Sequence, residues 1–361
     1  MKISEIRCHR LTAPLHTPFV TALRRTEHLE TTVVEVVGDD GSRGYGEAPQ
    51  VWRVTGESLA GAEACLSGPL ADVVRGRDLD DLGDLSREIG DAVVGNFGAK
   101  AAMDVALHDL AARRVGQTLA HFLGAAEGEQ RIETDVTVSA GEPDELAATA
   151  SKRTAEGFAV LKLKVGTDPD DPLTDVARVR AVREAAPYAR IRVDANQGWT
   201  PEQAIAAIRA MEDAGLGVEF VEQPVERYDI DGLATVTEAV DTLVMADESV
   251  FGPRELRAVI IRRAADMVNV KLAKCGGLGV ARVLLQGARD AGMGTIVGSM
   301  MEGPIGVGAA AALVAAVGTT HVSDLDAAWW ASASPVVGGA SYDAGVIVLP
   351  GAPGLGIGGL R

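Results

Sequence analysis

The feature that most constrains this chain is a series of ionisable residues that follow short β-branched runs at regular intervals. The series consists of Lys164, Asp194, Glu222, Asp247, Lys271 and Asp324. The first four intervals are 24 to 30 residues long, and the last is 53 residues. One interval is the length of a strand with its connecting helix, so each residue occupies the same place in its own unit. In a barrel such strand ends meet at one mouth.

Eight strand candidates carry this pattern, each followed by a helical segment. They are residues 134–138, 160–165, 191–194, 219–222, 243–247, 267–271, 294–297 and 321–324. The segments between them, such as 201–214 and 278–291, have apolar residues at helical spacing and Gly near their ends. We expect the last helix at 327–339, although that segment contains Pro and Gly. The pattern predicts a barrel of the (β/α)8 type.

The first 125 residues have a different organisation. Strand-like alternation at 2–10, 31–37 and 44–47 precedes helical patterns, notably at 99–114. The sequence Asp39-Asp40-Gly41 between the last two strands predicts a hairpin connection. Strands and helices in separate blocks indicate an α+β domain. The Gly/Pro-rich tail from Gly338 is expected to return to it.

Length and composition exclude several other classes of protein. At 361 residues the chain exceeds the usual size of one domain. A net charge of −17 disfavours nucleic acid and anionic membranes as partners. The N-terminus lacks the apolar core of a signal peptide, and the longest apolar run, 305–317, is too short to span a bilayer. Three cysteines without CxxC spacing make disulfides and zinc unexpected. We therefore expect a cytoplasmic protein.

Three of the strand-end residues, Asp194, Glu222 and Asp247, are carboxylates on adjacent strands. An oxygen-only set of ligands with vacant positions suits Mg²⁺. Without a cation, the three groups would repel and raise one another's pKa. The alternative is that each pairs with a Lys or Arg at the barrel rim.

The lysines of the series suit proton transfer. Period-2 alternation places Lys162 and Lys164 on the same side of one strand, toward the barrel interior. Two close ammonium groups lower each other's pKa, so that one can act as a base. Lys271 approaches from the opposite wall. A base on each side of a metal-bound carboxylate suits removal of an α-proton and its return to the other face. The alternative for any single lysine is a solvated side chain.

The motifs around these residues resemble those of the enolase superfamily, in its muconate lactonizing enzyme subgroup. They are Leu161-Lys162-Leu163-Lys164, Val193-Asp194-Ala195-Asn196, Val221-Glu222-Gln223-Pro224, Ala246-Asp247-Glu248-Ser249 and Asn269-Val270-Lys271-Leu272-Ala273-Lys274-Cys275-Gly276-Gly277. The resemblance covers essentially the whole chain. It implies the α/β class, with a modified (β/α)8 TIM-type barrel at 126–335, an N-terminal α+β capping domain at 1–125 and a C-terminal segment at 336–361 that returns to the cap.

The same resemblance implies roles for individual residues. Asp194, Glu222 and Asp247 would ligate one Mg²⁺ per subunit, and Lys164 and Lys271 would form the acid/base pair. Lys162 would hold the substrate carboxylate and tune Lys164. Asn196 and Glu248, in the same motifs, would support the ligands from behind.

The segment Asp324-Leu325-Asp326 reduces the number of reactions that fit this sequence. It places two carboxylates on one side of the predicted eighth strand. Two fixed negative charges suit a cationic group such as a free α-ammonium, although an Asp here can also cap the next helix. The motif resembles the Asp-x-Asp that binds the substrate ammonium in dipeptide epimerases. The segment 298–302 is also similar to that of dipeptide epimerases, and the resemblance implies that Ser299 and Met300 bind the substrate.

Substrate selection is expected from the first domain, in a loop at residues 19–30. Arg24 in this loop resembles the arginine that grips the glutamate side chain in L-Ala-D/L-Glu epimerases, and a guanidinium matches a carboxylate well. The alternative is a solvated loop residue. Trp329 and Trp330 are bulkier than this branch leads us to expect. If either enters the pocket, a different second residue is preferred.

These observations predict an isomerase, an Mg²⁺-dependent dipeptide epimerase that transfers a proton at the α-carbon of the C-terminal residue, with L-Ala-D/L-Glu as substrate. The alternatives are an N-acylamino acid racemase, an o-succinylbenzoate synthase or a muconate cycloisomerase on the same scaffold. A non-catalytic binding protein is a further alternative. The resemblance also implies a homo-oligomer, although no residue distinguishes an octamer from a dimer.

Overall fold

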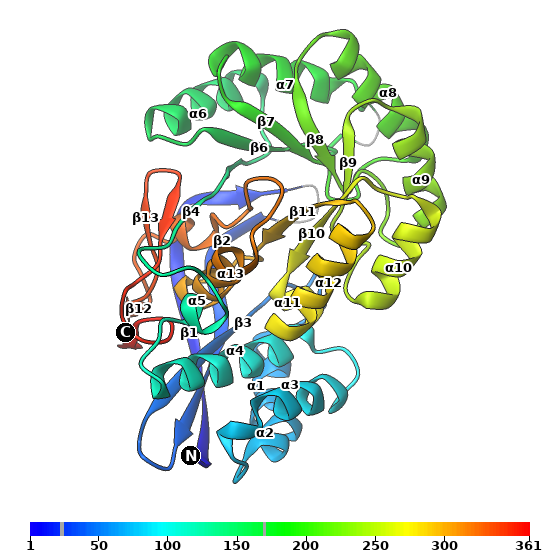
Figure 1. Ribbon diagram of the computed structural model, residues 1–361. Helices are drawn as coiled ribbons and strands as arrows, with labels where there is room; N and C mark the ends of the chain where they lie inside the picture. Colours follow the sequence, from blue (N-terminus) through cyan, green and yellow to red (C-terminus); the bar gives the residue numbers. More distant parts are fainter. Residues whose placement is uncertain (22–24, 169–170) are drawn as a thin grey trace.

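The computed structural model describes residues 1–21, 25–168 and 171–361. It consists of an antiparallel sheet with helices on one side and a curled parallel sheet surrounded by helices (Figure 1). Among the helices of these described ranges, none is both long enough and apolar enough to cross a membrane.

The first part contains the predicted antiparallel sheet and helices. Its strands, in the order β1-β2-β3, are β1 (Ile3–Val20), β2 (Arg25–Gly38) and β3 (Arg43–Pro49). Its helices are α1 (Leu59–Ser67), α2 (Pro69–Val74), the 3-10 helix η1 (Leu79–Asp81), α3 (Leu82–Asp91), α4 (Phe97–Arg114) and α5 (Leu119–Phe122). The three strands, the hairpin between β2 and β3 and the helix at 99–114 are thus confirmed.

Helix α4 packs directly on this sheet because two glycines let the backbones approach. A Cβ on Gly44 would lie 2.1 Å from the carbonyl oxygen of Ala106, and a Cβ on Gly46 would lie 1.8 Å from that of Ala102. Neither position has room for a side chain. The strand sequence therefore sets the close contact between helix and sheet.

The predicted loop at residues 19–30 is wrong for most of its length. Strands β1 and β2 continue into it, with Phe19 opposite Thr26 and Val20 opposite Arg25. Aromatic and β-branched side chains favour an extended backbone here, and Leu29 is buried. The long hairpin carries Phe19 as far as the mouth of the barrel.

The second part is a seven-stranded parallel sheet in the order β11-β10-β9-β8-β7-β6-β5. These strands are β5 (Val136–Val138), β6 (Val160–Lys164), β7 (Arg190–Asp194), β8 (Val218–Glu222), β9 (Leu243–Ala246), β10 (Met267–Lys271) and β11 (Gly294–Gly298). The helices that surround it are α6 (Pro143–Ala155), α7 (Thr174–Ala185), α8 (Pro201–Asp213), α9 (Ile230–Ala239), α10 (Pro253–Arg262), α11 (Leu272–Cys275), α12 (Leu278–Asp290) and α13 (Pro304–Val317). Seven of the eight predicted strands are confirmed.

The eighth strand, predicted at 321–324, does not form as a strand. Two single bridges, Thr134 to Ser323 and Gly298 to Asp324, join this segment to its neighbours and close the ring. The N–H of Asp324 donates to the carbonyl of Val297 at 3.0 Å. The segment is too short, and too quickly followed by a turn, to form a continuous ladder.

The helix predicted at 327–339 is also wrong. Only a 3-10 turn, η2 (Ala327–Trp330), forms. Pro335 lacks an N–H and disfavours a helical residue before it, and Gly338 adopts a φ of 77°. The chain instead enters strand β12 (Val336–Gly338).

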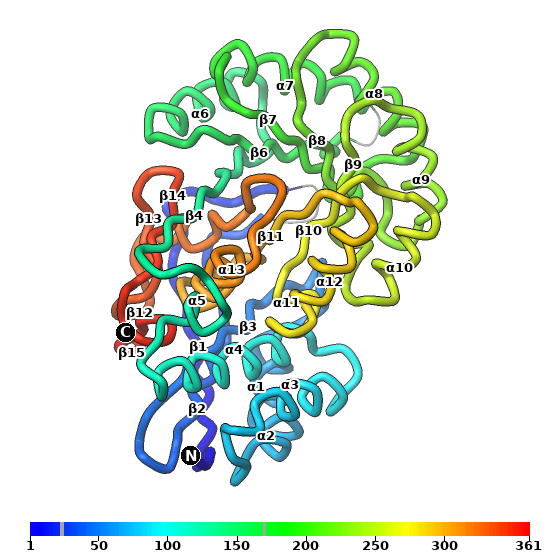
Figure 2. The backbone as a smooth tube through the Cα atoms, in the orientation of Figure 1, coloured from blue at the N-terminus to red at the C-terminus, as the bar shows by residue number. Residues whose placement is uncertain are grey.

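The C-terminal segment contains β12 and three more short strands, β13 (Ser341–Asp343), β14 (Val346–Val348) and β15 (Ile357–Leu360). β14 pairs with β4 (Arg131–Glu133), and β12 pairs with β15. The tail then contacts α4, because the N–H of Leu355 donates to Asp109 at 2.6 Å and Arg113 donates to the carbonyl of Ile357 at 2.8 Å. Figure 2 shows this return of the chain, in red.

A buried glutamate joins the two parts beside the barrel mouth. Glu47 on β3 is only 5% exposed, and its carboxylate accepts hydrogen bonds from the N–H groups of Gly303 at 2.7 Å and Gly306 at 2.9 Å. These donors belong to the N-terminus of α13, where backbone N–H groups lack helical partners. Glu47 therefore caps a barrel helix from the other part of the molecule.

We predict that Glu47→Ala destabilises the protein by about 2–3 kcal/mol, because two buried N–H groups lose their acceptor. Denaturant unfolding of wild type and variant measures the difference. Glu63→Ala is the control, since Glu63 forms a partly exposed ion pair with Arg10 and should contribute less than about 1 kcal/mol. Equal losses in the two variants would contradict the capping role.

Candidate active site

A cavity lies at the carboxyl ends of the barrel strands. Its lining contains ten of the side chains that the sequence analysis selected: Lys162, Lys164, Asn196, Asp247, Glu248, Lys271, Ser299, Met300, Asp324 and Asp326. Asp194 and Glu222 are fully buried behind the lining, in contact with Lys162. Arg24 lies outside the described residues. The barrel therefore brings together every other residue of the predicted site.

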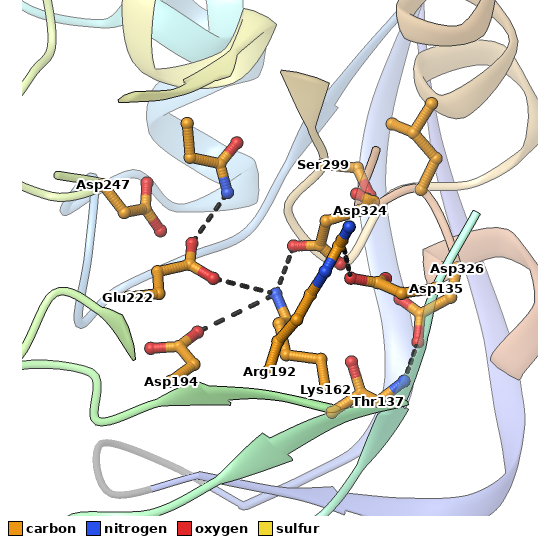
Figure 3. A network of polar contacts seen from close by, with 12 residues as sticks. Asp135, Thr137, Lys162, Arg192, Asp194, Glu222, Asp247, Ser299, Asp324 and Asp326 are labelled. Carbon is orange, nitrogen blue, oxygen red and sulfur yellow. Dashed lines mark hydrogen bonds and ion pairs between the residues drawn. The ribbon is translucent and has the colours of Figure 1, made fainter. Parts of the chain in front are cut away.

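Lys162 lies at the centre of the charged groups (Figure 3). Its Nζ contacts the carboxylates of Asp324, of Glu222 at 3.4 Å and of Asp194 at 3.8 Å. Burial by itself lowers the pKa of Lys162, but these carboxylates outweigh it and raise the pKa well above the ordinary value. The expectation that the lysines would lower one another's pKa is therefore wrong for Lys162, because carboxylates lie closer to it than other ammonium groups do.

The two expected acid/base lysines stand on strands β6 and β10, with three strands between them in the sheet. Nζ of Lys164 donates to Oδ2 of Asp194 at 2.6 Å, and Nζ of Lys271 donates to Oδ2 of Asp247 at 2.7 Å. Burial lowers the pKa of Lys271, yet Asp247 and Glu222 raise it overall. Each lysine thus contacts a carboxylate from the neighbouring unit of the barrel, Asp194 at the end of β7 and Asp247 directly after β9.

The carboxylates respond to this arrangement in different ways. Burial, together with the charge of Asp194, raises the pKa of Glu222 to about 8. Burial and the charges of Asp247 and Asp194 raise the pKa of Glu248 to about 7. Burial also opposes ionisation of Asp247, but Lys271 and Lys274 lower its pKa. The predicted mutual repulsion is confirmed for Glu222 and wrong for Asp247.

A divalent cation fits the chemistry of these donors. Asp194, Glu222 and Asp247 offer only oxygen, and burial, together with the charges of Asp194 and Asp247, raises the pKa of Glu222, so a cation there would favour its ionised form. Nearby, Oδ1 of Asn196 and Oε2 of Glu248 are buried acceptors without a hydrogen-bond partner. Among the described residues, however, no three acidic, His or Cys groups are close enough together to hold a metal ion in this arrangement. Lysine ammonium groups lie between the carboxylates instead.

The alternative interpretation, in which each carboxylate pairs with a Lys or Arg at the barrel rim, is therefore correct only in part. The partners are not solvated lysines of the barrel rim, since Lys162, Lys164 and Lys271 are all buried. They belong to the site itself.

Asp324 and Asp326 both line the cavity and are both buried, but they have different partners. Asp324 contacts the Lys162 ammonium. Oδ2 of Asp326 instead accepts from the backbone N–H of Thr137 at 2.7 Å and from Nε1 of Trp330 at 2.9 Å. Asp326 precedes η2 but makes no side-chain capping bond, so the structure does not support the capping alternative for this residue.

Neither tryptophan of the Trp329-Trp330 pair belongs to the cavity lining. Trp330 is only 2% exposed and packs in a cluster with Phe19, Leu29 and Met301. The Arg153 guanidinium lies 4.5 Å from the ring centroid of Trp329. The pair therefore stands behind the pocket wall, where it supports Phe19 and Met301.

Several residues of the site were missed by the sequence analysis. Asn269 donates to Glu222 at 2.7 Å, and Lys274 contacts Asp247. Strand alternation places Asn269 on the same face as Lys271, so a signal for it existed. Val54 comes from the first part of the molecule, and nothing in the local sequence marks it as a pocket residue. Phe19, also in the lining, begins the segment 19–30 that was expected to select the substrate.

Val54 is held over the barrel by a specific contact. Arg227, in the loop after β8, donates to the carbonyl of Val54 at 3.0 Å. Its guanidinium also lies 4.6 Å from the ring centroid of Tyr228 and 5.7 Å from that of Phe251. The first part of the molecule thus contributes one wall of the cavity in a fixed position.

Comparison with known families identifies both parts of the chain. Residues 3–124 match the mandelate racemase / muconate lactonizing enzyme N-terminal domain, and residues 145–358 match the enolase C-terminal domain-like family. Among characterised proteins, the chain is similar to the L-Ala-D/L-Glu epimerase of Bacillus subtilis, with 42% identity over 99% of this chain and 97% of that protein.

Solved structures show the same likeness. A substrate-liganded complex of the Bacillus subtilis L-Ala-D/L-Glu epimerase superposes with a TM-score of 0.96 at 41% identity and covers 100% of both chains. A dipeptide epimerase from Enterococcus faecalis V583, complexed with Mg and the dipeptide L-Leu-L-Tyr, superposes with a TM-score of 0.93 at 36% identity and covers 99% of both chains.

Glu302 lies under the Met300–Met301 wall and yields a prediction for the pH dependence of stability. It is buried, and burial together with Glu47 raises its pKa to about 8. Because the folded-state pKa exceeds the value of about 4.3 expected when unfolded, this group's contribution is complete below about pH 4.3 and is lost as the pH rises through about 8. We predict that the stability of Glu302→Gln relative to wild type increases when the pH is raised from 5 to 8.5. The expected increase is about 1 kcal/mol or more, the equivalent of about one pKa unit.

Unfolding free energies of the two proteins across that pH range measure this difference. Glu202→Gln, at an exposed position on α8, is the control and should show a constant offset. A constant offset for Glu302→Gln as well would contradict the raised pKa.

Proposed function

Because the chain belongs to the mandelate racemase / muconate lactonizing enzyme family of the enolase superfamily, we propose that it is an Mg²⁺-dependent dipeptide epimerase. The reaction is a 1,1-proton transfer at the α-carbon of the C-terminal residue. The observation that carries the proposal is one cavity with Lys164 and Lys271 on opposite walls and the Asp324/Asp326 pair at its side. Full-length relatives with this activity support it.

Asp194, Glu222 and Asp247 are the proposed metal ligands. Mg²⁺ bound there would stabilise the negative charge that develops on the substrate carboxylate when the α-proton leaves. Asn196 donates to Asp194 and to Glu248, both at 3.4 Å, and Asn269 donates to Glu222. These amides hold the carboxylates in place from behind, which is the support that ligating carboxylates require.

Lys164 and Lys271 are the proposed acid/base pair. Each lysine contacts a carboxylate that is also a proposed metal ligand, and a cation held by these carboxylates would weaken that pairing. Loss of the carboxylate and approach of positive charge both lower the pKa of a lysine. One neutral amine then removes the α-proton on one face, and the ammonium on the other wall returns a proton to the opposite face. Lys162, on the same strand as Lys164 and in the lining of the cavity, is proposed to bind the substrate carboxylate.

Asp324 and Asp326 are the proposed site for the free ammonium of the dipeptide. Two buried carboxylates at one edge of the cavity favour a cation there. The substrates of N-acylamino acid racemases, o-succinylbenzoate synthases and muconate cycloisomerases lack this ammonium. The aspartate pair therefore favours the epimerase over these alternatives.

We further propose L-Ala-D/L-Glu as the substrate. The similarity to the Bacillus subtilis enzyme and the presence of Arg24 in the expected loop support a glutamate side chain. The Enterococcus faecalis relative was crystallised with L-Leu-L-Tyr, so an apolar second residue is the competing specificity. A cytoplasmic homo-oligomer is the proposed form, on the basis of family resemblance alone.

We predict that the enzyme with Mg²⁺ in D₂O incorporates deuterium at the α-carbon of the C-terminal residue of L-Ala-L-Glu. Mass spectrometry of a mixed L,L-dipeptide library measures the exchange and ranks the side chains. Removal of Mg²⁺ with a chelator should abolish exchange, and its return should restore it. Binding of Mg²⁺ without exchange in any dipeptide would support the non-catalytic alternative. Exchange only in N-acyl amino acids would support the racemase.

We predict that Lys164→Ala and Lys271→Ala each lower the epimerisation rate by about 10²–10⁴-fold, because each removes one general acid/base. Exchange of the α-proton should survive for one epimer in each variant, and for opposite epimers in the two. Chiral chromatography with mass spectrometry distinguishes these products. Lys152→Ala, on the exposed face of α6, is the matched control and should leave the rate unchanged. Retention of wild-type epimerisation by either active-site variant would remove that lysine from the mechanism.

A further inference from the structure

The two aspartates of the Asp-x-Asp segment differ in the charge of their partners. Asp324 is paired with the ammonium of Lys162. Within the described ranges, no Lys or Arg nitrogen lies within ion-pair distance of Asp326. Oδ2 of Asp326 accepts from two neutral donors, the N–H of Thr137 at 2.7 Å and the indole Nε1–H of Trp330 at 2.9 Å. Asp326 therefore has neutral partners that fix its orientation and leave it without a cation among the described side chains, while burial and the charge of Asp324 raise its pKa.

Both neutral donors bind the same oxygen, Oδ2, and this fixes the orientation of the Asp326 carboxylate (Figure 3 shows the Thr137 contact). Oδ1 accepts no hydrogen bond from the described part of the chain. A carboxylate held at one oxygen by two N–H groups presents its second oxygen to the cavity it lines. Loss of either donor would free the side chain to rotate.

Trp330 is itself held firmly enough to position another group. It is almost completely buried, and its ring centroid lies 5.3 Å from that of Phe19 at an angle of 88°. On another side it stacks on His16, with centroids 5.2 Å apart and an angle of 17°. A buried indole N–H requires an acceptor, and Asp326 is the acceptor in this structure. The same ring therefore contacts one pocket residue, Phe19, and hydrogen-bonds to another.

We propose that Trp330 is a positioning residue for the substrate ammonium: its indole N–H fixes Asp326 in the orientation that receives this group. The inference rests on the proposed dipeptide function. Trp330 does not touch the substrate and acts through Asp326. Its bulk lies behind the wall of the pocket, so it selects for the ammonium and leaves the choice of the second side chain to other residues.

Trp330→Phe tests this role because it removes the N–H and keeps an aromatic ring against Phe19 and His16. Steady-state kinetics are measured for L-Ala-L-Glu and for its N-acetylated form, which lacks the ammonium. We expect KM for the free dipeptide to rise about tenfold, as for loss of a hydrogen bond to a charged group, with kcat within about twofold. The preference for the free over the acetylated dipeptide should fall by a similar factor.

Trp329→Phe is the matched control, because Trp329 neighbours Trp330 and its only hydrogen bond to Asp326 among the described contacts runs from its backbone N–H to the Asp326 carbonyl, which the substitution keeps. It should leave the preference within about twofold of wild type. In an Asp326→Asn background, Trp330→Phe should cause no further loss of preference. An unchanged preference in Trp330→Phe, or an equal loss of activity on both substrates, would overturn the inference and leave Trp330 a packing residue.

If Trp330→Phe does not fold, the wild-type enzyme answers the same question. The indole N–H resonance of Trp330 can be assigned by elimination with variants of the other three tryptophans, Trp52, Trp199 and Trp329. A shift on saturation with the free dipeptide but not with the acetylated form supports the inference, and equal responses to both overturn it. Absence of exchange in the wild-type enzyme is a separate result, which would count against the proposed function.

Discussion

The ammonium of Lys162, buried among three carboxylates, is the interaction on which the rest of the site depends. Removing so many charges from water costs several kcal/mol for each, and this is offset only when every charge has a partner in good geometry. Lys162 meets Asp194, Glu222 and Asp324, which come from three different segments of the chain. Loss of this one cation would leave buried carboxylates unpaired, which typically costs about 3–5 kcal/mol. The barrel can therefore close around its polar centre only in the arrangement that also assembles the site.

The same balance explains why the pKa values of Lys162 and Lys271 are raised, since the neighbouring carboxylates outweigh burial. The structure shows Lys271 and Lys274 neutralising Asp247, so the positive charge that a metal would supply is provided by side chains. If Asp194, Glu222 and Asp247 hold Mg²⁺ as proposed, the ion would supply positive charge to the same carboxylates that Lys162, Lys164 and Lys271 contact. The proposed metal ligands and the proposed acid/base pair would then share their partners.

The sequence predicted the strand ends well because two simple periods determine them. Alternation along a strand places Lys162 with Lys164, and the length of one unit brings Asp194, Glu222 and Asp247 to the same edge. The segment 321–324 was predicted to complete the barrel, but its attachment by two isolated bridges in place of a ladder could not be predicted, since these bridges join segments far apart in the chain. Phe19 begins the segment 19–30 that was expected to select the substrate, and a long hairpin brings it to the cavity. Val54 was missed, because it reaches the cavity through the Arg227 contact, which no local pattern reveals.

The Trp329-Trp330 pair shows how a correct observation from the sequence can have a different structural meaning. The two large side chains after the Asp-x-Asp segment, Trp329 and Trp330, suggested a pocket with less room for the second residue of the substrate. In the structure a single 3-10 turn follows Asp326, and this turn directs Trp330 behind the wall, where its N–H returns to the carboxylate four residues earlier. A regular helix at 327–339, as predicted, would have required a different course for the chain after Asp326. The proline and glycines that end the helix early thus leave the aspartate free to face the cavity, and the large aromatic ring supports this geometry without occupying the space of a substrate.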